Sequence, residues 1–135
     1  MIVWLASYPK SGNTLLRSIL SSYFFSNDGE FKFENLYQIT QFPLLEHFTS
    51  IDVDTNEDKA IFKNSINAQN FINKEKGKIK FFKTHSSFSK INNYNFTDFQ
   101  NTLGVIYIVR DPRNVVNSLA HHYNLSLDEA TETII

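Results

Sequence analysis

The first twenty residues constrain the fold most, because they read as a strand, a tight loop and a helix in direct succession. Residues 1–6 form a short apolar run with β-favouring Ile and Val, too short for a buried helix. Residues 7–14 contain Pro9, Gly12 and several hydroxyl or amide side chains, which is typical of a loop. From Thr14 the apolar residues recur at helical spacing. A loop that leads into a helix start points free backbone N–H groups at one spot, which favours an anion such as phosphate.

This loop differs from the nucleotide-triphosphate P-loop, G-x-x-x-x-G-K-[ST]. The leading Gly of that pattern is missing, no cation directly follows Gly12, and Lys10 precedes that Gly by two residues. The lysine is therefore displaced from the place that reaches a β- or γ-phosphate. By itself the loop allows two interpretations, a phosphate cradle and a structural turn with a solvated lysine.

Composition excludes several classes of protein. The 135 residues suffice for one small domain with a core. The chain has no cysteine, and its four histidines do not lie at zinc-site spacing, so we expect no metal site. A net charge of −1 gives no basic face for nucleic acid or anionic lipid. No apolar run approaches the ~18 residues of a membrane-spanning helix, and the N-terminal run is too short for a signal peptide. We expect a cytoplasmic protein with no nucleic-acid or membrane partner.

The middle of the chain predicts an irregular segment followed by a helix. Residues 30–50 are rich in Phe and Tyr and read as loops and short helices that cover the core, with a substrate-pocket wall as the alternative. Residues 57–76 read as a helix with an approximate apolar face. Thr55 and Asp58 resemble a capping box at its start, and Gly77 suits the position beyond its end.

Two further strands are expected, at residues 78–83 and 103–109. The second of these, LGVIYIV, is almost wholly apolar, which is typical of a buried parallel strand. Ligands of open α/β sheets bind outside the carboxyl ends of the strands. If the three strands are parallel neighbours, the polar groups that follow them converge on one site. These groups are residues 10–14, then Lys83 and His85, and finally Arg110.

Two helices are expected after the third strand. Asp111 is a good N-cap and Pro112 fits the first helical position, so one helix should run from there to about residue 123. Ser126 and Glu129 form the capping-box pattern of another helix. Because the sequence stops about two turns into that helix, we expect it to be the N-terminal part of a longer chain.

Together these segments resemble the PAPS-dependent sulfotransferase family. Residues 7–14, SYPKSGNT, are similar to the family's loop for the 5′-phosphosulfate, and residues 107–118, YIVRDPRNVVNS, resemble its 3′-phosphate segment. Lys83-Thr84-His85 lies between them, where the family carries its K-x-H. The resemblance implies an α/β fold of the P-loop-like sulfotransferase type, a parallel β-sheet flanked by helices. Residues 1–135 would then be a single, partial sulfotransferase domain.

The resemblance implies PAPS as co-substrate without a metal, and an alcohol, phenol, sugar or amine as the small-molecule or glycan acceptor. Carried over by position, Lys10 would stabilise the departing PAP, Lys83 would help to stabilise the transferring group, and His85 would be the general base. The other implied contacts are Ser11, Gly12, Asn13 and Thr14 on the 5′-phosphate, and Arg110 and Ser118 on the 3′-phosphate. Leu15 stands where many cytosolic members have an aromatic residue that stacks on the adenine.

General chemistry supports these roles. Sulfuryl transfer should need in-line positioning and fixed positive charge on the developing oxyanions, as phosphoryl transfer does. A histidine, with an intrinsic pKa of about 6.5, is suited to take a hydroxyl proton near neutral pH. An arginine binds a phosphate through a bidentate fork.

Two rival functions remain open at this point. One is a P-loop kinase or other NTP-binding enzyme, which the strand–loop–helix anion site allows. The other is an incomplete domain without activity, which binds PAP weakly or binds nothing. Single residues also have plainer interpretations, such as an ion pair between Arg110 and Asp111. We interpret the histidines other than His85 as structural, namely His47, His121 and His122.

Overall fold

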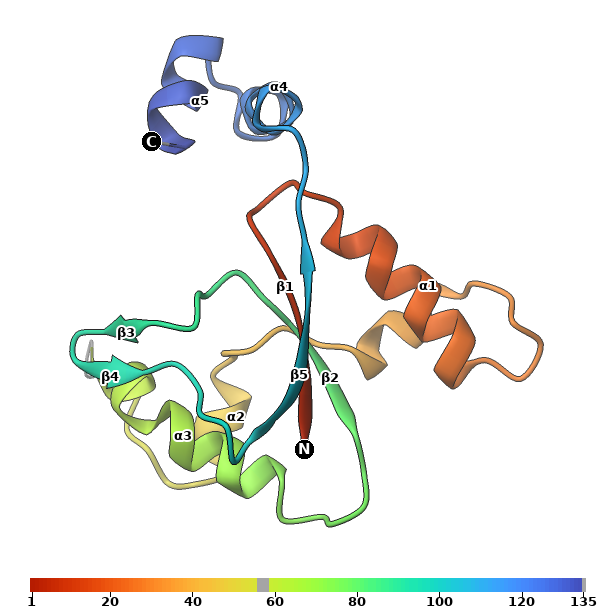
Figure 1. Cartoon of the computed structure of the whole chain (residues 1–135), viewed down its shortest axis with the longest axis vertical. Helices are drawn as coiled ribbons and strands as arrows, with labels where there is room; N and C mark the ends of the chain where they lie inside the picture. The colour runs from red at the N-terminus through yellow and green to blue at the C-terminus, as the bar shows by residue number, and fades with distance from the viewer. Residues whose placement is uncertain (56–58, 135) are drawn as a thin grey trace.

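A parallel sheet forms the centre of the fold. In the computed structural model, residues 1–55 and 59–134 are described, and their largest sheet has three strands in the order β2-β1-β5 (Figure 1). The central strand β1 (Ile2–Ser7) pairs in parallel with β2 (Lys80–Thr84) on one side and β5 (Thr102–Ile108) on the other. Because all three strands run the same way, their carboxyl ends meet at one edge. The α/β parallel sheet expected from the sequence is confirmed.

Helices cover the two faces of this sheet. α1 (Asn13–Phe25) packs on one face, where the ring of Phe24 lies 5.1 Å from that of Phe81 in β2. α3 (Ala60–Ile72) lies on the opposite side (Figure 1). There Ala68 joins a buried cluster with side chains from β1 and β2. Figure 1 thus shows a layered arrangement with the sheet between α1 and α3.

Aromatic rings build the main core on the α3 side. Trp4, at 1% exposure, lies 5.1–6.1 Å from three other rings, those of Phe42, Phe82 and Phe96. Phe42 and Phe48 come from the aromatic-rich segment, which contains only the short helices η1 (Phe33–Gln38) and α2 (Glu46–Thr49). Such rings contribute large buried areas and favour tilted or edge-to-face contacts. The segment therefore covers the core, as the first of the two interpretations expected.

A buried polar network fastens α3 to the connection that precedes β5. The Gln69 side chain donates to the Phe96 carbonyl (2.7 Å) and accepts from the Thr97 hydroxyl (2.6 Å). That connection also contains the antiparallel strands β3 (Lys90–Ile91) and β4 (Tyr94–Asn95). Asn92 and Asn93 turn between these strands with φ of 53° and 69°, a conformation that asparagine tolerates.

The helix predicted at residues 57–76 is shorter in the structure. α3 ends at Ile72, and the side chain of the next residue, Asn73, donates to Asn101 (2.8 Å). Gly77 lies in a later turn with φ 82°, so its expected place directly beyond the helix was wrong. The predicted capping box of Thr55 and Asp58 lies outside the described residues.

The strand β5 differs from the buried strand that its composition predicted. Val105 is 52% exposed and Tyr107 is 66% exposed. The reason is topological, because β5 lies at the edge of the sheet and is paired only with β1. Complete burial is found instead at the centre of the sheet, in Ile2 and Leu5.

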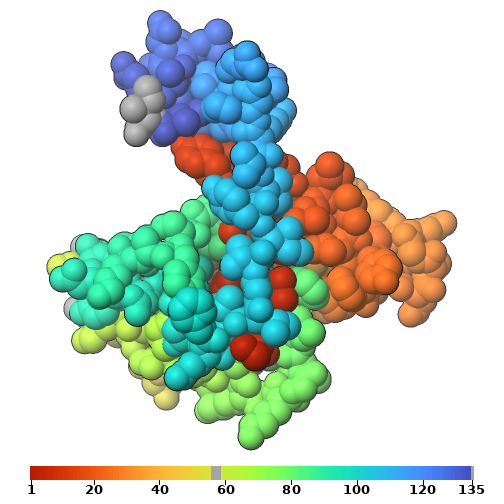
Figure 2. Space-filling view, viewed as in Figure 1, coloured from red at the N-terminus to blue at the C-terminus, as the bar shows by residue number. Residues whose placement is uncertain are grey.

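The last two helices form a small core of their own. α4 (Pro112–Tyr123) and α5 (Leu127–Ile134) bury Val115, Leu119, Ala120 and Ala130 between them. They lie beyond the end of β5 and are set apart from the rest of the molecule (Figure 2). Both predicted helix starts are confirmed.

Side-chain caps fix these two helix starts. Asp111 Oδ1 accepts from the N–H of Arg113 (2.9 Å). The Ser126 hydroxyl accepts from the Glu129 N–H (3.2 Å), while the Glu129 carboxylate accepts from the Ser126 N–H (2.8 Å). No helix among the described residues is both long and apolar enough to cross a bilayer.

Replacing Gln69 by Met tests the buried network. The change keeps the volume but leaves the Phe96 carbonyl and the Thr97 hydroxyl without this partner, so we expect the free energy of unfolding to fall by about 1–3 kcal/mol. Urea unfolding followed by circular dichroism measures the loss. Asn67→Met, at an exposed position of the same helix, is the matched control and should change stability little. Equal stability of the two variants would contradict a role for this network.

Candidate functional site

The three polar segments meet at a cavity of about 600 Å³ at the carboxyl edge of the sheet. Every site residue expected from the sequence lines this cavity except Ser11, which is buried and lines a neighbouring hollow. The lining consists of Pro9, Lys10, Gly12, Asn13, Thr14, Gln41, Lys83, His85, Arg110, Ser118, His122 and Tyr123. The parallel strand order therefore brings together residues that lie far apart in the chain.

The loop after β1 leaves the start of α1 open to the cavity. Gly12, with φ 106°, occupies the N-cap position, a backbone conformation that glycine adopts without strain. No side chain caps this helix, and its first turn contains no acidic residue. The first N–H groups of an α-helix have no partner within the helix and carry partial positive charge. With Lys10 beside them, they form a site that suits an anion.

Asn13 ties the helix start to the sheet. Its side-chain amide donates to the Leu5 carbonyl (2.8 Å) and to the Ser7 hydroxyl (3.2 Å). Asn13 is only 5% exposed, so its amide N–H groups are engaged by β1. A phosphate at the helix start would therefore meet the backbone N–H of Asn13 and not its side chain.

His85 is held in one orientation by the end of β1. Its Nδ1 lies 2.7 Å from the Ser7 carbonyl oxygen. A carbonyl accepts only, so Nδ1 carries the hydrogen and the neutral ring presents the lone pair of Nε2. The residue is exposed and lines the cavity. The arrangement therefore provides a proton acceptor next to the cationic groups.

Lys83 and Arg17 place two cations close together beside the cavity. Burial lowers the pKa of Lys83, and the positive charge of Arg17 lowers it further. Burial also lowers the pKa of Arg17, whose Nη2 donates to the Leu36 carbonyl (3.0 Å). Both shifts indicate charges that are incompletely compensated. An anion bound at this point would relieve them.

Arg110 links the end of β5 to the loop. Its Nη1 donates to the carbonyl of Lys10 (2.9 Å), and the guanidinium has further donors at the cavity. The alternative ion pair with Asp111 is not formed. Asp111 instead pairs with Arg113 at 2.6 Å, and these hydrogen bonds lower the pKa of the carboxyl. Arg110 is therefore free of that carboxylate.

The cavity also contains residues that sequence reasoning missed. His122, interpreted as structural, follows Ser118 by one helical turn and lines the cavity with it, so helical periodicity could have identified it. Tyr123 lies beside it, with ring centroids 4.7 Å apart. Gln41 is placed at the cavity by an isolated parallel β-bridge to Lys83. No local sequence pattern predicts this contact.

The other histidines show different surroundings. His47 stacks on Phe42, with ring centroids 5.1 Å apart, and burial lowers its pKa. This environment is that of a core histidine, as expected. His121 is exposed and is not part of the cavity lining. Among the described residues, no group of three or more His, Cys, Asp or Glu side chains is arranged to hold a metal ion.

Comparison with protein families gives one finding. A family model described as a sulfotransferase domain matches residues 2–134. The match includes all three segments that line the cavity. A search of curated proteins gave no significant match.

The charge of Arg17 should be measurable at Lys83. Arg17→Gln removes a nearby positive charge and keeps a donor for the Leu36 carbonyl, so we expect the pKa of Lys83 to rise toward the usual lysine value of about 10.4. The measurement is the pH dependence of Lys83 acetylation, read by peptide mass spectrometry. Lys63→Gln removes an exposed cation on α3 and should leave this midpoint unchanged. The same midpoint in all three proteins would refute the coupling.

Proposed function

We propose that this chain, which belongs to the sulfotransferase domain family, transfers a sulfuryl group from PAPS to an acceptor hydroxyl or amine. Family membership establishes a sulfotransferase with a sulfate donor as co-substrate. The identity of that donor and the roles of single residues are our proposal, as are the partial domain at residues 1–135 and its cytoplasmic location. The observation that carries the proposal is the convergence of three separate segments on one cationic cavity.

The donor's phosphates find complementary groups at two places in the cavity. The open N–H groups at the start of α1, together with Lys10 and Thr14, suit the 5′-phosphosulfate. Arg110 and Ser118 suit the 3′-phosphate, since a guanidinium binds phosphate through paired donors. Ser11 is buried and its backbone N–H donates to the Tyr8 carbonyl (3.3 Å), so its proposed contact with the 5′-phosphate has no free backbone donor.

The transfer exchanges one sulfur–oxygen bond for another. The acceptor oxygen forms a bond to sulfur, while the bond between sulfur and the bridging oxygen of the 5′-phosphate breaks. Nε2 of His85 takes the acceptor proton, because Nδ1 is engaged by the Ser7 carbonyl. The ammonium of Lys10 stabilises the oxygen that leaves with PAP, and Lys83 stabilises charge on the sulfuryl oxygens.

The kinase alternative has less support from these residues. Mg²⁺ at kinase sites is held by carboxylates and phosphate oxygens. The described residues that line the cavity include no Asp or Glu. Lys10, Lys83 and Arg110 line the cavity instead. Such fixed positive charges suit a reaction in which PAP leaves through its 5′-phosphate oxygen.

Calorimetric titration with PAP tests the donor site. We expect binding without Mg²⁺, weakened at least about tenfold by Arg110→Ala, because the 3′-phosphate loses paired donors. Arg113→Ala is the matched control, since Arg113 is exposed, pairs with Asp111 and is not part of the lining. Mg-ATP binding without any response to PAP would favour the kinase. A cooperatively folded chain that ignores PAP would favour the incomplete domain.

Replacing His85 by Gln separates catalysis from binding. We expect sulfuryl transfer to a phenolic acceptor to fall by about 10²–10⁴-fold, because the general base is lost. PAP affinity should stay within about twofold, since the ring is not proposed to hold phosphate. Transfer is followed with radiolabelled PAPS. His121→Gln, at an exposed position outside the lining, should retain full transfer. Undiminished transfer by His85→Gln would remove the proposed base.

A further inference from the structure

We propose that a second hollow, of about 310 Å³ on the α3 side of the sheet, binds the acceptor, and that the acceptor is a neutral molecule with a flat aromatic body. The inference rests on the proposed function, because it names the molecule that receives the sulfuryl group. Three features of the hollow carry it: its place next to His85, the pairing of its polar atoms and its lack of charge.

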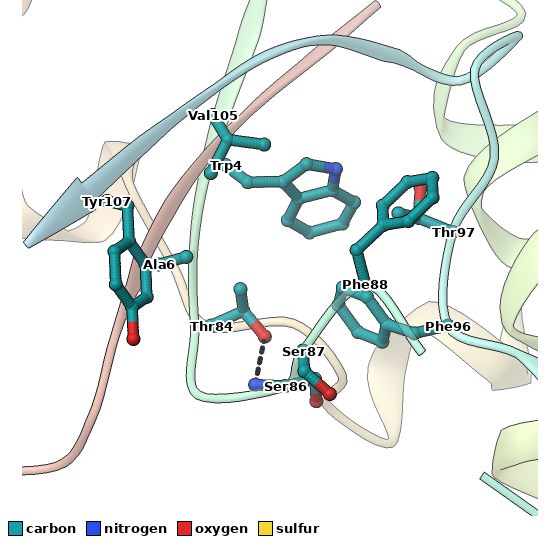
Figure 3. A pocket seen from close by; sticks show the side chains of 10 residues that line it. All are labelled: Trp4, Ala6, Thr84, Ser86, Ser87, Phe88, Phe96, Thr97, Val105 and Tyr107. Carbon is teal, nitrogen blue, oxygen red and sulfur yellow. Dashed lines mark hydrogen bonds between the residues drawn. The ribbon is translucent and has the colours of Figure 1, made fainter. Parts of the chain in front are cut away.

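The hollow lies on one face of the sheet and is walled by aromatic rings (Figure 3). Trp4 and Ala6 of β1 and Val105 and Tyr107 of β5 alternate along their strands, so they project from the same face. The segments after β2 and after β4 supply the opposite wall with Ser86, Ser87, Phe88, Phe96 and Thr97. In Figure 3 these side chains surround the hollow.

His85 connects the hollow with the cationic cavity. Thr84 and Ser86 line the hollow, whereas His85 between them lines the cavity. On the neighbouring strand, Ala6 lines the hollow and the next carbonyl, that of Ser7, holds the His85 ring. At the end of β1, only Ser7 and Tyr8 lie between Ala6 of the hollow and Pro9 of the cavity, and from Lys83 to Ser86 the two linings alternate residue by residue. A body in the hollow lies beside the proposed base.

Four of the six polar side-chain atoms of the wall, those of Trp4, Thr84, Ser87 and Thr97, are already paired within the protein, and the hydroxyls of Ser86 and Tyr107 are the exceptions. The Thr84 hydroxyl accepts from the Ser86 N–H (3.0 Å), as Figure 3 shows. The Trp4 Nε1 donates to the Thr102 hydroxyl (3.0 Å), and the Thr97 hydroxyl donates to Gln69 (2.6 Å). A sugar carries more hydroxyls than those of Ser86 and Tyr107 can pair, so it would bury hydroxyls without partners here, at a cost for each of them. A flat aromatic ring instead matches the rings of the wall.

The distribution of charge agrees with two different ligands. Among the described residues that line the hollow, none is Asp, Glu, Lys, Arg or His. The neighbouring cavity, by contrast, contains Lys10, Lys83 and Arg110. A charged ligand placed in the hollow would lose hydration without a counter-charge. The anionic donor therefore belongs in the cavity and a neutral acceptor in the hollow.

The single tryptophan of the chain provides a specific probe, because Trp4 lines the hollow and has one indole N–H signal. We would titrate the PAP-loaded protein with 2-naphthol, and separately with methyl glucoside, and record ¹H–¹⁵N NMR spectra. We expect 2-naphthol to shift the Trp4 indole signal in a saturable manner and methyl glucoside to leave it unchanged.

Variants on β5 locate the binding. Val105→Phe fills the hollow and should weaken 2-naphthol binding at least about tenfold. Ile106→Phe adds the same ring on the opposite face, at a residue that is 40% exposed, and should change the affinity less than about twofold. If Val105→Phe does not fold, Phe88→Ala at an exposed wall position replaces it, with the same loss expected.

Each outcome decides one question. PAP binding without a response of Trp4 to 2-naphthol, or equal affinity in Val105→Phe, would overturn the acceptor site and leave the donor site standing. A saturable shift by methyl glucoside that Val105→Phe removes would overturn the aromatic class. A response to 2-naphthol without any PAP binding would support the hollow as an aromatic site and refute the proposed function instead.

Discussion

The parallel pairing of β1 with β2 and β5 is the constraint on which the site depends. It places three carboxyl ends at one edge, so polar residues separated by about a hundred positions line one cavity. The pairing itself is stabilised by the burial of apolar surface on both faces of β1. The strand is thus buried along most of its length, and its end carries the loop that we propose to bind the donor's phosphate. Residues that hold this pairing, Trp4 among them, act on the site without being part of the cavity.

Hydrogen bonds to the strand ends and loop orient the polar groups before any ligand is bound. Asn13 donates to Leu5, His85 is held by Ser7, and Arg110 donates to Lys10. In each case a side chain from one segment contacts the backbone of another. Ligand binding is stronger when groups are ordered beforehand, because less conformational entropy is lost. The same contacts assign a tautomer to the histidine and keep the arginine away from its neighbouring carboxylate. The positions of the Leu5, Ser7 and Lys10 carbonyls therefore determine how the polar side chains of the site are oriented.

Sequence reasoning predicted what depends on local pattern and missed what depends on tertiary contacts. The strand, loop and helix at residues 1–20, the capped starts of α4 and α5, and the parallel sheet are all present. The convergence of Lys10, Lys83, His85 and Arg110 followed from strand direction, whereas Ser118, which lies on α4, was predicted only from the family resemblance. By contrast, an apolar composition could not reveal that β5 lies at the sheet edge, since that depends on which strands pair. The sequence also could not show that the side-chain amide of Asn13 donates to β1. An asparagine looks the same in the sequence whether its amide contacts a ligand or a backbone carbonyl.

The separate core of α4 and α5 has a consequence for how the cavity responds to ligands. The cavity has walls from two independently packed bodies, the sheet with its loop on one side and α4 on the other. Between them, the Tyr8 hydroxyl donates a hydrogen bond to the Thr133 carbonyl (3.3 Å). A nucleotide that touches both walls adds its binding free energy to the docking of one body on the other. The affinity for the nucleotide and the docking of the two bodies then depend on each other. A substitution in the α4–α5 core, far from any phosphate, would shift the fraction of molecules in which the two walls face each other. It would thereby alter the nucleotide affinity.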